Sequence, residues 1–337
     1  MRPFFILFFS IIFFASSAFA REQLIIEPDM GIAPISAMIA DAKSSVDLVT
    51  YGFTEKQLIS AFINAKKRGK NVSILLEPHP YKAEDENISA IQQFHTANIN
   101  VLTPNPDVRL THQKTLITDQ NLALIMTFNF THSTFTKERN FGLIIDDPAM
   151  IQEIIRIFNA DTQHKNISVT HPNLVWSPNN SREKILNFIN DAHSEIKIYA
   201  QDVSDYQTIG ALAKAARAGK KIQILMPEPR QTTHSKKFAY LKKAGIDIRF
   251  SKNYLIHAKV MIVDRKRAML GSTNLTRSSI NENRELSIIT QDPEVIKELI
   301  KTFNQDWGST SFDAKQFQTK ISPQLMHTIK HLLRQLQ

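Results

Sequence analysis

The chain contains two copies of one residue pattern, and this duplication constrains its fold more than any other feature. The pattern is H-x-K-x-x-x-x-D, and its two copies are His112, Lys114 and Asp119, then His257, Lys259 and Asp264. The residues that follow also repeat 145 positions later: Thr127 and Ser272, Asn129 and Asn274, Arg139 and Arg284, Asp147 and Asp292. An internal repeat of this length predicts two structural units with the same fold.

The repeat extends upstream of the motifs, where residues 39–42 match 189–192 and residues 67–70 match 217–220, both at a spacing of 150. In each half, short apolar runs alternate with amphipathic segments, which indicates α/β layers. The predicted strands are 47–51, 72–76 and 99–102, then 197–201, 222–226 and 246–250; the predicted helices are 55–67 and 206–217. A closing helix is expected after Asp147-Pro148 and after Asp292-Pro293, because proline suits the first turn of a helix.

The motif itself predicts a site for phosphorus chemistry. In residues 257–264 the side chains of a strand alternate between two faces, so His257 and Lys259 point the same way and Asp264 points the other way. An ammonium group neutralises phosphoryl oxygens, and an imidazole can attack phosphorus or move a proton. One copy supplies one histidine. Two copies supply a nucleophile and an acid.

These motifs resemble those of the phospholipase D superfamily, in which two H-x-K-x-x-x-x-D motifs, each followed by G-S-x-N, converge on one phosphodiesterase site. The resemblance covers nearly the whole chain after residue 20. It implies an α/β fold of two phospholipase D-like layered domains related by a pseudo-twofold axis, with both histidines at the seam. It implies a phosphohistidine intermediate. No cofactor is expected, and no metal site either, because the sequence shows no carboxylate or histidine cluster and the lysines supply positive charge. The superfamily also includes cardiolipin synthases, nucleases and inactive relatives.

The resemblance also implies a role for each motif residue. His112 is expected to attack phosphorus and His257 to act as the acid, with Lys114, Lys259, Asn129 and Asn274 holding the phosphoryl oxygens. The full candidate site is His112, Lys114, Asp119, Asn129, His257, Lys259, Asp264, Ser272, Asn274 and Glu285. Within it, strand parity gives Asp119 and Asp264 a structural role.

Two departures from the pattern lie in the first half. Glu285 follows His257 by 28 residues, where the family places a carboxylate against the imidazole, whereas the equivalent first-half residue is Asn140. We therefore expect Glu285 to pair with His257 and make it the better acid. Alternatively, Asn140 marks only a half that has drifted. Met126 stands where the second half has Gly271, and we expect its bulk to narrow the pocket.

The first twenty residues have the features of a secretory signal peptide: Arg2, an apolar run from Phe4 to Phe14, and small residues before a cleavage after Ala20. The apolar run is shorter than the roughly 20 residues of a spanning helix, which disfavours the alternative of an uncleaved anchor. A periplasmic or secreted protein is expected. The chain has no cysteine, which excludes disulfides and thiolate chemistry. Its net charge of +9 becomes +8 without Arg2 and suits a phosphate-bearing partner, although it also favours solubility alone.

The expected domains are a signal peptide at 1–20, a first phospholipase D-like domain at 21–165, a linker at 166–180, a second such domain at 181–310, and a tail at 311–337. The tail carries apolar residues at helical spacing from Leu325 to Leu336. This amphipathic helix is expected to dock on the body of the protein, with a membrane surface as the alternative.

The leading functional hypothesis is an exported phospholipase D-like hydrolase or transferase, acting on the head-group phosphodiester of a phospholipid. The runner-up is an exported, metal-independent endonuclease, because the basic charge also suits a polyanion. A third hypothesis, a binding protein without catalysis, is disfavoured by the two intact histidine-lysine pairs. An anionic membrane surface is a possible partner, and a monomer is expected because one chain holds both half-sites.

Overall fold

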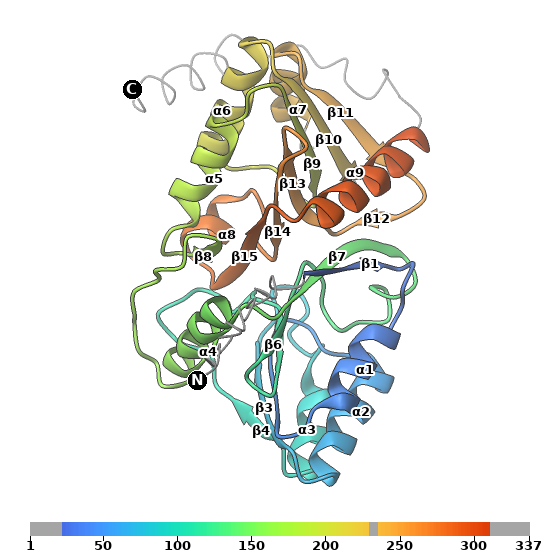
Figure 1. The fold of residues 1–337 in the computed structure, drawn as a ribbon, viewed down its shortest axis with the longest axis vertical. Helices are drawn as coiled ribbons and strands as arrows, with labels where there is room; N and C mark the ends of the chain where they lie inside the picture. The colour runs from blue at the N-terminus through green and yellow to red at the C-terminus, as the bar shows by residue number, and fades with distance from the viewer. Residues whose placement is uncertain (1–21, 229–234, 311–337) are drawn as a thin grey trace, which may run out of the picture.

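The computed structural model describes residues 22–228 and 235–310, which form two α/β halves placed one above the other (Figure 1). The strands of the first half are β1 (Gln23–Glu27), β2 (Ser45–Thr50), β3 (Asn71–Leu76), β4 (Asn100–Leu102), β5 (Thr115–Thr118), β6 (Leu122–Met126) and β7 (Glu138–Ile145). Its helices are α1 (Ala33–Asp41), α2 (Lys56–Lys67), α3 (Ile88–Thr96) and α4 (Pro148–Thr162).

The second half repeats this series of elements. Its strands are β8 (Leu174–Ser177), β9 (Glu195–Ala200), β10 (Lys221–Pro227), β11 (Asp247–Ser251), β12 (Leu255–Ile256), β13 (Lys259–Val263), β14 (Arg267–Gly271) and β15 (Glu285–Thr290). Its helices are α5 (Ser181–Asn190), α6 (Tyr206–Arg217), α7 (Ser235–Lys243), α8 (Arg277–Asn281) and α9 (Pro293–Gly308). The predicted strands and helices of both halves are confirmed, with ends that differ by one or two residues.

The two sheets have the same strand order. The first runs β1-β7-β6-β5-β2-β3-β4 and the second runs β8-β15-β14-β13-β9-β10-β11. In each sheet, three neighbouring strands are parallel (β2, β3 and β4; β9, β10 and β11) and the remaining pairings are antiparallel. The short strand β12 is an exception, because it pairs with β7 of the first sheet. The expected fold class is thus confirmed, and the duplication extends to the whole topology.

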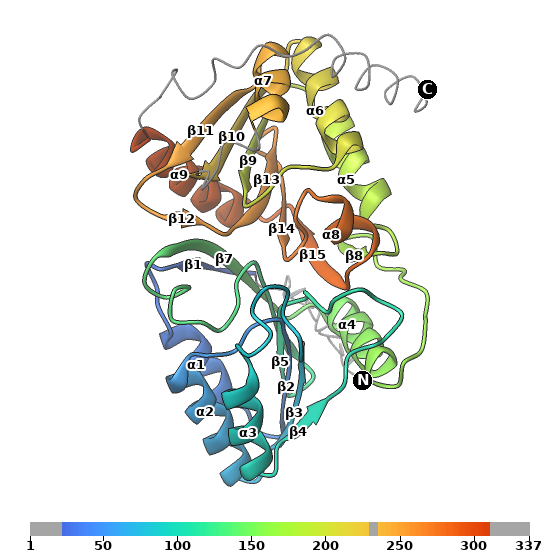
Figure 2. The same ribbon diagram turned by 180° about the vertical axis from the view of Figure 1, so that it is seen from behind.

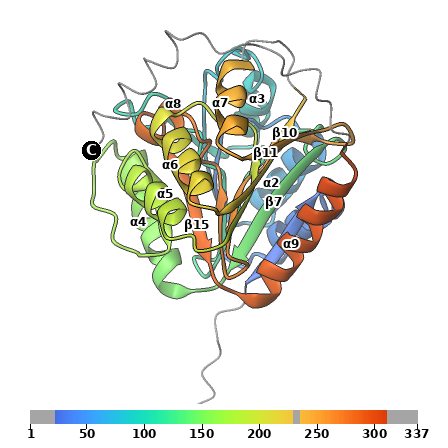
Figure 3. The ribbon, with the colours of Figure 1, turned by 90° about the horizontal axis from the view of Figure 1, so that it is seen from above.

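The interface between the halves is a hydrophobic core. Residues of β7 and α4, such as Phe141 and Ile154, pack in one cluster with residues of β15 and α9, such as Leu286 and Phe303. Helices α1, α2 and α3 cover the other face of the first sheet (Figure 2), and α4 and α9 lie on opposite sides of the molecule when it is seen from above (Figure 3). The two closing helices begin as expected, each capped by an aspartate side chain, Asp147 or Asp292.

Each half begins with an edge strand, β1 or β8. The segment expected as a linker, 166–180, is only partly a connection, because β8 within it pairs with β15. All four residues of β8 are buried, so the alternation that marks a half-buried strand is missing from its sequence. The predicted signal peptide and the predicted tail helix lie outside the described residues. Of the helices in the described ranges, none is long and apolar enough to cross a bilayer.

Candidate active site

Both motif histidines line one cavity of about 830 Å³ between the halves. The first half contributes Tyr51, His112 and Asn129 to its wall. The second half contributes His257, Asn274 and most of the remaining lining. The structure therefore brings the two half-sites together, as the sequence predicted, and makes a single pocket with two imidazoles.

The partner of His112 is Glu285, which comes from the other half of the molecule. The Nδ1 atom of His112 lies 2.8 and 3.0 Å from the two carboxylate oxygens of Glu285, which is fully buried. Ser279 donates a hydrogen bond to the same carboxylate, and the backbone N–H of His112 donates to the carbonyl of Arg284 at 2.9 Å. The expectation that Glu285 pairs with His257 is wrong, because the start of β15 crosses the interface and docks beside the opposite motif.

The partner of His257 is Asn140, by the reciprocal crossing of β7. The Nδ1 atom of His257 lies 3.0 Å from Oδ1 of Asn140, whose oxygen also accepts a hydrogen bond from Thr127 at 2.8 Å. Behind the amide lies Glu138, with its Oε2 atom 3.7 Å from Nδ1 of His257. Each imidazole is thus held by a polar side chain of the opposite half, a carboxylate for His112 and an amide for His257.

The two motif lysines are buried behind the histidines. The ammonium of Lys114 donates to the carbonyl of His112 at 2.7 Å, and that of Lys259 donates to the carbonyl of Thr127 at 3.2 Å. Burial lowers the pKa of Lys114 to about 7, against the opposing effect of Glu285, and the pKa of Lys259 is also lowered by burial and by the charge of Lys114. Two ammonium groups that are poorly solvated and mutually repelling are ready to bind an anion.

The histidines are neutral in the free protein. Burial lowers the pKa of His112 to about 4, although Glu285 opposes the shift. The pKa of His257 lies well below its usual range because of burial and of the charges on Lys259, Lys114 and His112. Since Nδ1 of each ring faces Glu285 or Asn140, the Nε2 atoms are left for other partners. The Nε2 atom of His257 lies 3.2 Å from the ammonium of Lys259.

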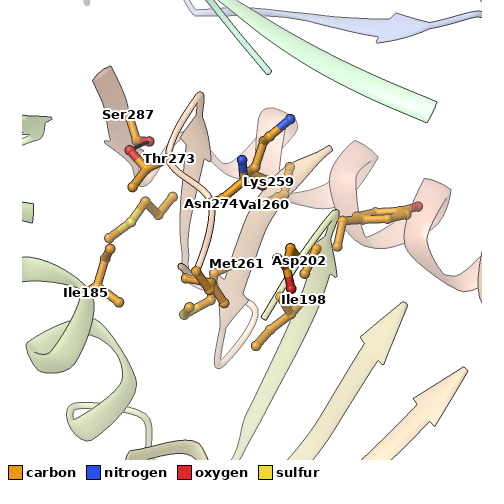
Figure 4. A pocket seen from close by; sticks show the side chains of 13 residues that line it. Ile185, Ile198, Asp202, Lys259, Val260, Met261, Thr273, Asn274 and Ser287 are labelled. Carbon is orange, nitrogen blue, oxygen red and sulfur yellow. Dashed lines mark hydrogen bonds between the residues drawn. The ribbon is translucent and has the colours of Figure 1, made fainter. Parts of the chain in front are cut away.

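Asn129 and Asn274 line the cavity wall. The Oδ1 atom of each is buried and has no hydrogen-bond partner among the described residues. Below Lys259 and Asn274 lies a second cavity of about 20 Å³, walled in part by Thr273 and Ser287 (Figure 4). This volume holds about one water molecule.

The two motif aspartates lie away from this pocket, at the far ends of β5 and β13. The carboxylate of Asp119 accepts hydrogen bonds from the backbone N–H groups of Lys43, Ser44 and Ser45. Asp264 does the same with residues 193–195. This placement agrees with the structural role expected from strand parity, and neither aspartate lines the cavity that holds the histidines.

Two further expectations concern the residues after each motif. Ser272 is fully buried and hydrogen-bonds to the backbone of Leu286 at 3.0 Å, so it supports the strand that carries Glu285 rather than facing the cavity. Met126 is also fully buried and packs in the core of the first half. It does not line the cavity that holds the two histidines, so the expectation that it narrows the pocket is wrong.

Sequence reasoning missed Glu138 and Ser279, which stand directly behind the residues that hold the histidines. A signal was present for Glu138, because it lies two residues from Asn140 in a segment that repeats around Glu285. Within the described ranges, no group of three or more histidine, aspartate or glutamate residues is arranged to hold a metal ion.

Comparison with known proteins gives a consistent result. Residues 35–162 and 185–307 match the family described as cardiolipin synthase, PLD-like domain. A phospholipase D of Rickettsia felis is 33% identical over 124 residues, which cover 36% of this chain and 60% of that protein. Cardiolipin synthase B of Escherichia coli K12 is 23% identical over 351 residues, which cover 90% of this chain and 83% of that protein.

Two solved structures share the fold over almost the whole chain. A phosphatidylserine synthase of Haemophilus influenzae has a TM-score of 0.70 at 13% identity and covers 93% of this chain and 92% of its own. A polyphosphate kinase of Porphyromonas gingivalis has a TM-score of 0.68 at 16% identity and covers 94% of this chain. This chain spans about half of the kinase, 53% of its length.

Proposed function

The chain belongs to the phospholipase D-like family that includes cardiolipin synthases, and on that premise we propose that it hydrolyses or transfers the head group of a phospholipid through a phosphohistidine. Family membership makes it an enzyme of phosphodiester chemistry. The observation that carries the finer proposal is the placement of His112 and His257 in one cavity, each held at Nδ1 by the opposite half.

In the first step, the lone pair on Nε2 of His112 attacks phosphorus. A P–N bond forms, the bond from phosphorus to the leaving oxygen breaks, and that oxygen takes a proton from Nε2 of His257. Glu285 accepts the Nδ1–H of His112 and stabilises the positive charge that develops on the ring. The sequence suggested His112 as the nucleophile because Glu285 was expected to pair with His257. The structure pairs Glu285 with His112, and this also supports His112 as the nucleophile, because the carboxylate favours the phosphorylated, cationic imidazole.

In the second step, the neutral His257 takes a proton from water or an alcohol as its oxygen attacks phosphorus. The P–N bond breaks and its electron pair returns to His112. His257 needs a proton for the first step although its pKa is low in the free protein. Binding of a phosphodiester raises the pKa of His257, because the negative charge of the phosphodiester offsets the ammonium groups of Lys114 and Lys259.

The cavity lining favours a lipid over a nucleic acid. Its second-half wall includes six apolar residues beside polar ones such as Gln201 and Ser204; the apolar residues are Met226, Pro227, Phe238, Phe250, Leu255 and Ile256. The same wall carries Asp202 and Glu228, and no lysine or arginine is among the described lining residues. A nuclease needs basic groups along the strand beyond the scissile phosphate, whereas apolar groups suit the glycerol and acyl part of a lipid. The endonuclease remains the second candidate because of the net charge of +9.

The proposal is tested with purified protein on vesicles of phosphatidylcholine, of phosphatidylglycerol, and on single- and double-stranded DNA, all with a chelator present. We expect head-group release from one class of vesicle, transfer to a primary alcohol when one is added, and loss of both in His112→Ala and His257→Ala. Cleavage of DNA that weakens steeply with salt, with intact vesicles, would overturn the lipid proposal.

The nucleophile is identified by trapping the intermediate and locating the phosphate by mass spectrometry. We expect it on His112, and we expect no phosphorylated protein from His112→Ala. Phosphate on His257 with His112 unmodified would reverse the assignment. An exported enzyme acting at a membrane surface as a monomer fits this substrate, and fractionation of cells together with size-exclusion chromatography checks those points.

A further inference from the structure

The segments that hold the two histidines have the same three residue types in opposite order. The segment at the start of β7 reads Glu138, Arg139, Asn140, and the segment that leads into β15 reads Asn283, Arg284, Glu285. The arginine keeps its place and the carboxylate and the amide exchange places. His112 therefore meets its carboxylate directly, whereas His257 meets its carboxylate behind an amide.

Glu138 is held firmly in that second position. The residue is buried, at 8% exposure. Its carboxylate accepts hydrogen bonds from Ser133 at 2.7 Å and from the Nδ2 atom of Asn140 at 3.0 Å. These two donors hold the buried carboxylate in place, and its negative charge lies 3.7 Å from Nδ1 of His257.

This network also fixes the orientation of Asn140 and the tautomer of His257. Side-chain amides are oriented by their hydrogen bonds, and a carboxylate can only accept, so the nitrogen of Asn140 must face Glu138. Its oxygen then faces His257, and the Nδ1 atom of His257 must carry the hydrogen. The Nε2 atom of His257 is left with a lone pair directed away from β7. Reversal of the amide would place its oxygen against the carboxylate, which is repulsive.

We propose that Glu138 is a positioning residue for His257, acting through Asn140 as the carboxylate that the second half-site would otherwise lack. It holds the ring in the tautomer with the hydrogen on Nδ1, and its charge stabilises the imidazolium that donates the proton to the leaving oxygen. This role rests on the proposed function of the site, and it adds a residue that the repeated motif does not contain.

The other titratable groups that face His257 are Lys259 of its own segment and, from the first half, Lys114 and His112, and each of them opposes protonation of His257 when it is itself charged. An anionic Glu138 at 3.7 Å from Nδ1 of His257 favours protonation of the ring on coulombic grounds, and it raises the pKa of both lysines. Replacing its charge by an amide should therefore make the imidazolium harder to form. A full charge lost at this distance changes a protonation equilibrium by at least about tenfold.

The first test needs no activity. The tautomer and titration of His257 are followed by long-range proton–nitrogen NMR in the wild type, Glu138→Gln and Asn140→Asp. We expect the wild-type ring to carry its hydrogen on Nδ1. In the presence of dimethyl phosphate, Glu138→Gln should lower the pKa of His257, and Asn140→Asp in that background should restore it.

A matched control for this titration is Glu86→Gln. Glu86 is a half-buried carboxylate close enough to Glu138 for the two charges to repel, and that repulsion, after burial, raises its pKa. Among the described contacts, Glu86 makes no ion pair with either histidine, whereas Glu138 lies 3.7 Å from Nδ1 of His257. The variant should therefore leave the titration of His257 unchanged, and an equal shift in both variants would show that the effect of Glu138→Gln is not specific to its position.

The second test is kinetic and uses the vesicle substrate that the wild type cleaves. Glu138→Gln should lower kcat about tenfold at neutral pH and shift the basic limb of the kcat profile to lower pH, with recovery in Glu138→Gln/Asn140→Asp. An unchanged pH profile with an unchanged NMR titration would overturn the role of Glu138. An inactive wild type with the expected NMR shifts would instead count against the proposed function alone, and a thermal melt separates either result from unfolding.

Discussion

Arg139 of the first half makes a two-point ion pair with Asp306 of the second, with Nε to Oδ2 at 2.8 Å and Nη2 to Oδ1 at 3.1 Å. The reciprocal pair joins Arg284 to Asp161 at 2.8 Å. The carbonyl of Arg139 accepts from the backbone N–H of His257, just as that of Arg284 accepts from His112. The same two residues therefore join the halves and fix the backbone of each histidine.

Breaking one of these pairs should destabilise the protein strongly. Asp306→Asn leaves the guanidinium of Arg139 buried at 3% exposure with the partly exposed Asp29 as its remaining carboxylate. Removal of one partner of a buried ion pair costs about 3–5 kcal/mol. The free energy of unfolding from urea titration measures the loss. Glu294→Gln, in an exposed pair with Lys297 on the same helix, is the control and should not change it measurably.

The duplication allowed the fold to be predicted, but not which half supplies each partner. Residues 145 apart were bound to occupy equivalent places, so strands, helices and closing caps followed from the sequence. The pairing of Glu285 with His112 did not follow, because a spacing of 28 residues after His257 is compatible with contact inside one half or across the interface. The packing of β7 and β15 around one core determines which histidine Glu285 contacts. No local sequence pattern indicates this packing.

Binding of a phosphodiester anion should weaken as pH rises through about 7. Burial lowers the pKa of Lys114 to about 7 in the free protein, so its ammonium is present below that pH and is lost above it. Affinity for dimethyl phosphate, which remains a monoanion throughout, should then fall by up to about tenfold per pH unit. Calorimetric titration across this range checks the trend. Lys114→Met should bind weakly at every pH, and a retained inflection near neutrality in that variant would contradict the assignment.

Asp119→Ala should lower stability without changing the chemistry. The carboxylate holds three backbone N–H groups at the start of β2, which are left without that partner in the variant. Loss of such bonds costs about 1–3 kcal/mol, and kcat well below the melting temperature should stay within about twofold. Asp264→Ala is the matched variant in the other half. A large fall in kcat for a folded variant would contradict a purely structural role for Asp119 and Asp264.

The contribution of Asp119 to stability should be lost at acid pH. Three backbone donors lower the pKa of Asp119 to about 2 against the effect of burial. A carboxyl whose pKa is depressed by folding stabilises the protein above its ordinary pKa, and this contribution is lost as pH falls toward the folded value. The difference in melting temperature between the wild type and Asp119→Ala should therefore shrink between about pH 4 and about pH 2. If the difference stays constant over this interval, the backbone donors are not what depresses the pKa.

The cross-strand neighbours of Met126 and Gly271 could not be predicted from either strand alone. Its equivalent is Gly271, and the bulk at Met126 is accommodated because its cross-strand neighbour is Gly142, whereas Gly271 stands opposite Ser287. The glycine of each pair has changed strand between the halves. A sequence pattern that compares position with position reports the loss of a glycine at Met126, but the compensating glycine lies 16 residues later and is recognised only from the register.

This exchange predicts unequal costs for adding a methyl group to the two glycines. A Cβ atom at Gly271 would lie 2.3 Å from the backbone oxygen of Leu286, and its φ of +156° is rarely adopted by other residues. A Cβ atom at Gly142 would meet only side chains, the Leu124 methyl at 2.9 Å and the ring of Phe128 at 3.3 Å. Side chains can shift, and such overpacking costs about 1–3 kcal/mol. Gly271→Ala should lower the free energy of unfolding, measured by urea titration, more than Gly142→Ala does. The reason is that its Cβ atom clashes with the backbone of the strand that carries Glu285. The reverse order would show that β15 shifts more readily than the core of the first half.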